Sequence, residues 1–159
     1  MLIFLSILVI FSYGNNIGAL NSSISNNSFN GKVTGVIDGY TLEIDNRMVK
    51  LALLHDTEPN DKEILNEATH HTSMLCPIRS PALIYPDNSQ QDENENNSTK
   101  KLSATVYCLA NNNDNNGTMV SINESLLEAK LGVIDKDACK VSEHAKEEWA
   151  QRHGCNNIE

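Results

Sequence analysis

Basic residues are scarce in this chain. Its 159 residues include 12 lysines and arginines against 21 aspartates and glutamates, which gives a formal net charge of −9 at pH 7. Such a protein gains no general attraction to a phosphate backbone, the usual electrostatic footprint of a nucleic-acid-binding protein. The composition therefore argues against a module that simply coats DNA or RNA. It still allows an enzyme that places a cation between its carboxylates and a phosphate.

A long apolar run is also missing. The most apolar stretch, residues 1–13, is too short for an ordinary membrane-spanning helix. It lacks preceding basic residues, but its terminal position and the small, polar residues after it are typical of an export signal or an uncleaved anchor. We therefore predict a signal peptide or anchor over residues 1–20, a flexible linker over 21–31, and membrane contact only through the N-terminal segment.

The cysteines include no C-x-x-C pair, so the sequence gives no sign of a zinc site. An even number of cysteines in an exported chain instead predicts two disulfides among Cys76, Cys108, Cys139 and Cys155. A helix expected over residues 141–153 would separate its ends by about 20 Å, whereas bonded cysteines have Cα atoms within about 7 Å of each other. Either this helix is shorter than expected, or both bridges connect the first two cysteines to the last two.

Six Asn-x-Ser/Thr sequons fit an exported chain as well. They begin at Asn21, Asn26, Asn96, Asn97, Asn116 and Asn123. Each is a candidate acceptor for N-glycosylation. In a chain this rich in asparagine, such triplets also arise by chance.

Residues 31–61 predict a three-stranded meander. Two alternating apolar runs flank Asp38-Gly39, and this dipeptide is a strong hairpin signal. A second reversal at residues 45–46 leads into residues 48–54, which are so apolar that we expect a strand buried on both faces. Pro59 cannot donate a ladder hydrogen bond and ends the sheet.

The rest of the chain predicts two more barrel strands and three helices. The first expected helix covers residues 61–75 and has a capping box at Asn60 and Glu63. Strands follow over 81–85 and 102–110, with a short return over 118–121. Two more helices are expected over 122–129 and 141–153, the last with Trp149 in the core. A helix between the third and fourth strands indicates a small barrel of the OB type. The predicted fold class is α+β, a five-stranded OB-like barrel with three helices.

The order of these motifs resembles the staphylococcal nuclease (thermonuclease) family. The family's V-x-D-G-D-T-[LV] corresponds to residues 36–42, VIDGYTL, and its [VF]-R-L-x-x-[IV]-D-T-P-E to residues 49–58, VKLALLHDTE. Val106-Tyr107 and residues 122–127 are similar to the segments A-x-[IV]-Y and [VL]-N-x-x-L-[VL]. The cysteine-bearing segments look like an exported branch. The resemblance covers residues 32–155 and implies one SNase-like domain there.

The resemblance implies a calcium-dependent phosphodiesterase site. In the family, two aspartates hold the ion, a glutamate orients or deprotonates the attacking water, and two arginines clamp the phosphate. Transferred by motif position, Glu58 is the base, and Asp38 and Asp56 surround the metal. Lys50 and Lys101 stand where the family has its two arginines.

The chain departs from the family at several of these positions. Tyr40 replaces the first metal-binding aspartate, and a neutral phenol is a poor calcium ligand. The second aspartate falls on His55 without a gap, or on Asp56 with a one-residue insertion. The two lysines offer only point charges in place of the arginine forks. Together these losses should lower the rate by several powers of ten.

Two functional hypotheses follow. The first is an exported thermonuclease-like domain that binds nucleic acid or a nucleotide, with weak or no calcium-dependent hydrolysis. The second is a non-catalytic extracellular OB-fold module with a binding or structural role. In the second, Asp38 is only a turn residue, and Lys50 and Lys101 are solvated.

Overall fold

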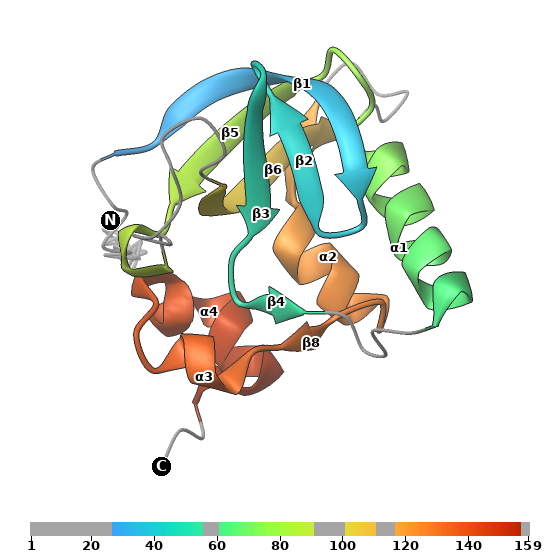
Figure 1. Cartoon of the computed structure of the whole chain (residues 1–159). Coiled ribbons are helices and arrows are strands. Elements are labelled where there is room, and N and C mark those ends of the chain that lie inside the picture. Colours follow the sequence, from blue (N-terminus) through green and yellow to red (C-terminus); the bar gives the residue numbers. More distant parts are fainter. Residues whose placement is uncertain (1–26, 56–60, 91–100, 111–116, 157–159) are drawn as a thin grey trace, which may run out of the picture.

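The computed structural model describes residues 27–55, 61–90, 101–110 and 117–156 (Figure 1). Its strands are β1 (Phe29–Asp38), β2 (Thr41–Ile44), β3 (Arg47–Leu51), β4 (Leu54–His55), β5 (Pro81–Pro86), β6 (Leu102–Ala110), β7 (Thr118–Ser121) and β8 (Val133–Ile134). Its helices are α1 (Lys62–Leu75), α2 (Ile122–Glu128), α3 (Lys136–Cys139) and α4 (Glu148–Ala150), with short helical turns η1 (Asn88–Gln90), η2 (Glu143–Lys146) and η3 (Gln151–Cys155). The predicted signal or anchor segment lies outside the described residues.

Five strands close into a barrel. β1 pairs antiparallel with β2 and β5, β2 pairs with β3, and β5 pairs with β6, while β3 and β6 complete the ring in parallel. With α1 between β3 and β5, this is an OB-like barrel, and the predicted fold class is confirmed. β1 begins at Phe29, upstream of the predicted domain start at residue 32. Within the described ranges, no helix is both long enough and apolar enough to cross a membrane.

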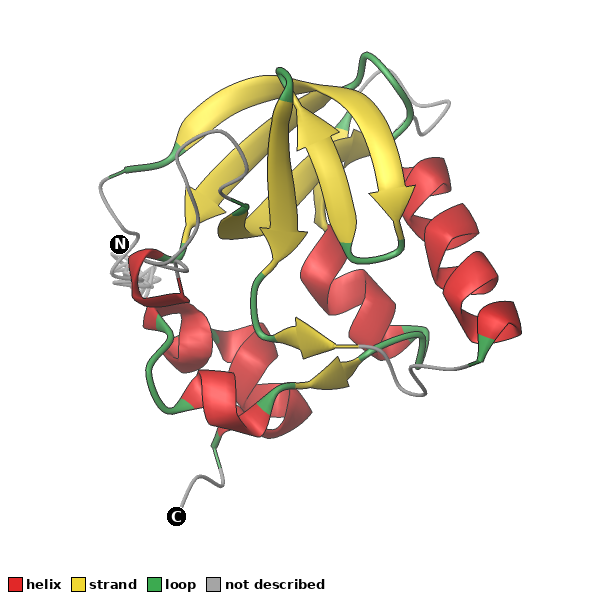
Figure 2. Ribbon diagram, viewed as in Figure 1, coloured by secondary structure: helices red, strands yellow, loops and turns green. Residues whose placement is uncertain are grey.

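The helices and the small second sheet cover one side and one end of the barrel. Figure 2 shows α1 along the side of the barrel and α2 across its lower end in this view, with α3, α4, β4 and β8 forming a layer below. β4 and β8 pair antiparallel as a separate two-stranded sheet, which the sequence analysis did not predict. The helical part also differs from the predicted three helices, because α3 is an additional short helix and only short helical segments, α4 among them, stand in place of the expected long C-terminal one.

Both predicted turns of the meander are present. β1 and β2 are joined through residues 39–40, and β2 and β3 through Asp45 and Asn46. The φ angles of Asp45 and Asn46 are 47° and 63°, in the left-handed region that a tight hairpin turn requires. Gly39 has a different role, because a Cβ there would lie only 2.5 Å from the Cβ of Ala68 in α1. The glycine therefore allows α1 to pack directly on the first turn.

The third strand is shorter than predicted. β3 ends at Leu51, and Leu53 has a φ of 62°, so the chain bends before it enters β4. All residues from Leu51 to Leu54 are nevertheless buried. The apolar run thus reports burial correctly, but the burial comes from a bend between two sheets and not from one continuous strand.

The N-cap of α1 lies one residue later than predicted. The side chain of Asp61 accepts hydrogen bonds from the backbone N–H groups of Glu63 at 2.9 Å and Ile64 at 3.3 Å, so Asp61 is the N-cap. Asn60, the predicted cap, lies outside the described residues. Cys76 follows the helix, and its backbone N–H donates to the carbonyl of Thr72 at 2.8 Å.

The predicted helix over residues 141–153 is wrong. The segment is broken into η2, α4 and η3, and Glu147 at the break has an extended ψ of 147°. The break returns the chain toward α3, so Cys139 and Cys155 form a disulfide with Cα atoms 5.5 Å apart. Cys76 pairs with Cys108 at 5.4 Å. Trp149 is buried, as predicted.

Asn123 stabilises the parallel contact between β3 and β6, called here the barrel seam. Its Oδ1 accepts from the N–H of Val106 at 3.0 Å, and its Nδ2 donates to the carbonyls of Ala52 at 2.9 Å and Ala104 at 3.3 Å. The side chain therefore links β6 to the residue after β3. Asn123 is fully buried. It therefore has a structural role, and its sequon does not offer an exposed acceptor for a glycan.

Replacing Asn123 by alanine should lower the free energy of unfolding by about 3 kcal/mol, because buried backbone groups of the seam lose their partners. Urea unfolding of the two proteins measures this difference. Asn66→Ala is the matched control, since Asn66 is exposed on α1 and alanine favours a helix. Equal stability of Asn123→Ala and the parent chain would contradict the assigned role.

A buried histidine attaches the C-terminal segment to β5. His144 is 3 % exposed; its Nδ1 lies 2.5 Å from Oε1 of Glu147, and its Nε2 lies 3.0 Å from the carbonyl of Tyr85. Both partners are acceptors, so both nitrogens can donate only when the ring is cationic. Burial by itself lowers the pKa of His144, but the hydrogen bond to Glu147 and the charges of Glu147 and Asp87 outweigh it, and the net shift is upward.

The upward pKa shift of His144 predicts that stability falls in alkaline solution. A group with a raised folded-state pKa contributes stability fully below its ordinary value of 6.5, and this contribution is lost as pH rises through the folded-state pKa. The free energy of unfolding should therefore decrease above neutral pH. His144→Gln should flatten this dependence, whereas His70→Gln, at an exposed position, should not. A parent profile identical to that of His144→Gln would refute the linkage.

Candidate functional site

An open pocket of about 470 Å³ lies between the barrel seam and the C-terminal segment. The barrel contributes two lysines, and the opposite wall contributes two aspartates. The lining residues are Lys50, Leu51, Leu53, Leu54, Lys101, Ser103, Asp135, Asp137, Ala138 and Val141. Two of the predicted site residues, Lys50 and Lys101, therefore share one pocket.

The parallel seam brings the two lysines together. In the β3–β6 register, Val49 lies opposite Leu102 and Lys50 opposite Ser103. Lys101 immediately precedes Leu102, so it lies beside β3 although it is distant in sequence. Both lysines are exposed, and the strand ladder fixes the backbone that carries them. The pocket therefore has two ammonium groups on its barrel side, and each is a point charge that can pair with an anion.

The opposite wall is negatively charged, and the sequence analysis missed it. Asp135 is the N-cap of α3 and accepts from the N–H groups of Asp137 at 3.0 Å and Ala138 at 2.9 Å. Its own N–H donates to the carbonyl of Leu53 at 2.9 Å, which holds this wall against the bend after β3. The hydrogen bond from Lys140 lowers the pKa of Asp137. An aspartate before a short helical segment was the available signal.

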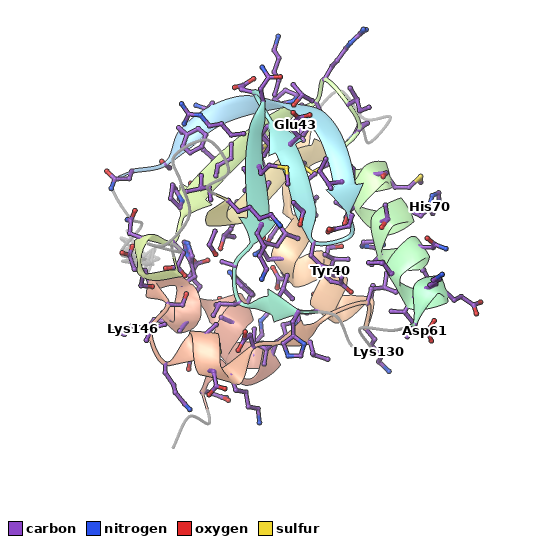
Figure 3. The ribbon with its side chains drawn as sticks, in the orientation of Figure 1. Tyr40, Glu43, Asp61, His70, Lys130 and Lys146 are labelled. Carbon is purple, nitrogen blue, oxygen red and sulfur yellow. A yellow bond between two sulfur atoms is a disulfide. The ribbon has the colours of Figure 1, made fainter. Side chains whose placement is uncertain are left out.

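Tyr40 has a structural role. Its side chain is 5 % exposed and lies in the interior between the first turn and the layer below the barrel (Figure 3). Its hydroxyl donates to the carbonyl of Leu131 in the loop after α2. A Cβ on Gly132 would lie 3.4 Å from Cε1 of Tyr40, so this loop packs closely on the ring. Tyr40 therefore connects the barrel to the loop that leads into β8.

The remaining predicted residues are only partly described. Oδ1 of Asp38 accepts from the N–H of Tyr40 at 2.8 Å, so this carboxylate stabilises the first turn. His55 is exposed at the end of β4, opposite Val133 of β8. Asp56 and Glu58, the predicted second metal ligand and base, lie outside the described residues.

Tyr40→Phe should lower the free energy of unfolding by about 1 kcal/mol, because it removes one buried hydrogen bond and leaves the ring in place. Thermal or urea unfolding measures the change. Tyr85→Phe is the matched control, since the half-buried Tyr85 hydroxyl has no hydrogen bond within the described part of the chain. A larger loss in Tyr85→Phe than in Tyr40→Phe would contradict the assigned anchor.

Comparisons of the sequence with protein-family models and with curated proteins find no match.

Proposed function

We propose that this chain is a thermonuclease-like barrel that binds the phosphate group of a nucleotide or single-stranded nucleic acid, with little or no hydrolysis. The proposal depends on one observation, that Lys50 and Lys101 line the same pocket. These are the two positions at which the sequence resembles the phosphate-clamping arginines of that family. Leu53 and Leu54 give the same pocket an apolar surface beside the charges, as a nucleoside would need.

Weak hydrolysis is proposed because the described residues at the predicted metal positions, Tyr40 and Asp38, suit a calcium ion poorly. Calcium prefers several oxygen ligands of high charge density. The hydroxyl of Tyr40 is neutral and donates to Leu131, and one oxygen of Asp38 serves the first turn. We therefore assign no reaction step to a metal. Binding by the lysines needs no ion, whereas a clamp of two ammonium groups lacks the geometric match that an arginine fork gives to a phosphate.

A non-catalytic structural role is the second candidate, and the acidic wall of the pocket favours it. Asp135 and Asp137 line the same pocket as the two lysines and offset their charge. The net charge of −9 also disfavours an anionic ligand. In this case the pocket holds no phosphate, and the domain serves as a disulfide-stabilised module.

We propose an extracellular or cell-surface location in either case. Both disulfides are formed, and such bridges persist in oxidising compartments. Residues 1–20 would direct export as a signal peptide or remain as an anchor. Their length and apolar composition, read from the sequence, support this proposal.

Titration with a nucleoside 3′,5′-bisphosphate in the absence of metal tests phosphate binding. Lys50→Met and Lys101→Met should each weaken binding by about tenfold, since each removes a charge-assisted contact. Lys62→Met is the matched control, because Lys62 is exposed at the start of α1. Two results would reject the phosphate pocket: no saturable binding, or saturable binding that neither pocket substitution weakens. Either result would leave the structural role as the remaining candidate.

A cleavage assay separates binding from catalysis. Single-stranded DNA is incubated with the protein and calcium, and the parent chain is compared with Glu58→Gln. We expect at most slow cleavage, and any activity of this protein should be lost in Glu58→Gln. Equal residual cleavage by both proteins would exclude Glu58 as a base and the catalytic function with it, while the binding proposal would be unaffected.

A further inference from the structure

A second cluster of ligating side chains lies away from the lysine pocket. Carboxylate oxygens of Glu124 and Glu128 and a ring nitrogen of His153 all lie within 4.8 Å of one another. Among the residues described, this is the one group of three such side chains. None of the three lines the lysine pocket. We propose that Glu124, Glu128 and His153 form a binding site for a divalent transition-metal ion of the zinc type.

Two rigid elements hold these ligands. Glu124 and Glu128 are one turn apart on α2, so their side chains share one face of that helix. The rest of α2 is fixed in the core through Ile122, Asn123 and Leu126, which are fully buried. The site therefore has two of its ligands on a helix that cannot shift without disrupting the barrel seam.

The third ligand is positioned by the disulfide. His153 lies in η3, next to Gly154 with a φ of 126° and two residues before Cys155. Cys155 is bonded to Cys139 and buried. The covalent link and the glycine turn place an imidazole from the C-terminal segment beside two carboxylates of α2. Such preorganisation reduces the entropy lost when an ion binds.

The donor set selects the class of ion. One imidazole nitrogen with two carboxylate oxygens is a set that zinc and its neighbours accept, with water in the remaining position. Calcium, a hard cation, prefers oxygen ligands alone. The site therefore differs in both ligands and location from the calcium site that the sequence resemblance implies. It needs neither the lysine pocket nor hydrolysis.

Arg152 is the neighbour that competes with a cation. Its guanidinium donates to Oε1 of Glu124, and its Nε lies 3.8 Å from Oε1 of Glu148. A carboxylate has two oxygens, so Glu124 can pair with Arg152 through one and bind an ion through the other. The positive charge of Arg152 opposes the ion, and this opposition gives the proposal a distinctive test.

Zinc titration of the full chain, first treated with a chelator and then dialysed, tests the site. We expect one saturable zinc equivalent by calorimetry, a higher melting temperature with zinc than with calcium, and d–d absorption bands when cobalt replaces zinc. Glu128→Gln and His153→Ala should each weaken zinc binding by about tenfold or more. Glu128 is exposed, so its substitution leaves the fold intact even if His153→Ala does not.

Two further variants distinguish the site from surface histidines and from a structural ion pair. His70→Ala should leave zinc binding unchanged, because His70 points away from α1 into solvent (Figure 3). Arg152→Gln should bind zinc more tightly than the parent chain, since a competing positive charge is removed. Any one of four results would overturn the proposal. These are undiminished zinc binding in Glu128→Gln, loss of binding in His70→Ala, weaker binding in Arg152→Gln, and the absence of saturable heat.

Discussion

The parallel contact between β3 and β6 is the interaction on which the rest of the structure depends. It closes the barrel, and in a closed barrel the strand edges no longer expose unpaired backbone groups. The seam continues past the strands, where the N–H of Ala52 donates to the carbonyl of Ala104 at 2.8 Å and Asn123 bonds to both segments. The same contact brings Lys50 and Lys101 into one pocket. Fold and candidate site therefore share one cause.

Tyr40 shows how a residue at a predicted site position can serve stability. An aspartate here would leave a carboxylate near the buried carbonyl of Leu131, whereas the phenol donates to that carbonyl and fills the space above Gly132. Compared with the aspartate that the resemblance implies, the tyrosine offers an apolar ring with one polar contact in place of a charge. The motif resemblance predicted a lost metal ligand at this position. It could not identify the new partner, because that partner is a backbone carbonyl far along the chain.

Local signals predicted most of the barrel, and tertiary contacts decided the rest. Short-range contacts and conformations explain three features: the turn at residues 39–40, in which Asp38 accepts from the N–H of Tyr40, the turn at residues 45–46, and the cap of α1 at Asp61. They do not explain the break at Glu147. It depends on His144, which bonds both to Glu147 and to a carbonyl of β5, and on the bridge between Cys139 and Cys155. Helical periodicity contains no information about either partner.

The C-terminal segment controls the charge of the lysine pocket. The lysines are carried by the barrel ladder, but Asp135 and Asp137 are carried by α3, which ends at Cys139 of the second disulfide. The two walls are thus held by different forces, one by strand hydrogen bonds and the other by a covalent bridge and the contact of Asp135 with Leu53. Because Coulomb interactions weaken with distance, any outward shift of α3 leaves the lysines more positive toward an anion. In the proposed phosphate pocket, the affinity for an anion would therefore depend on whether a disulfide outside the pocket is oxidised.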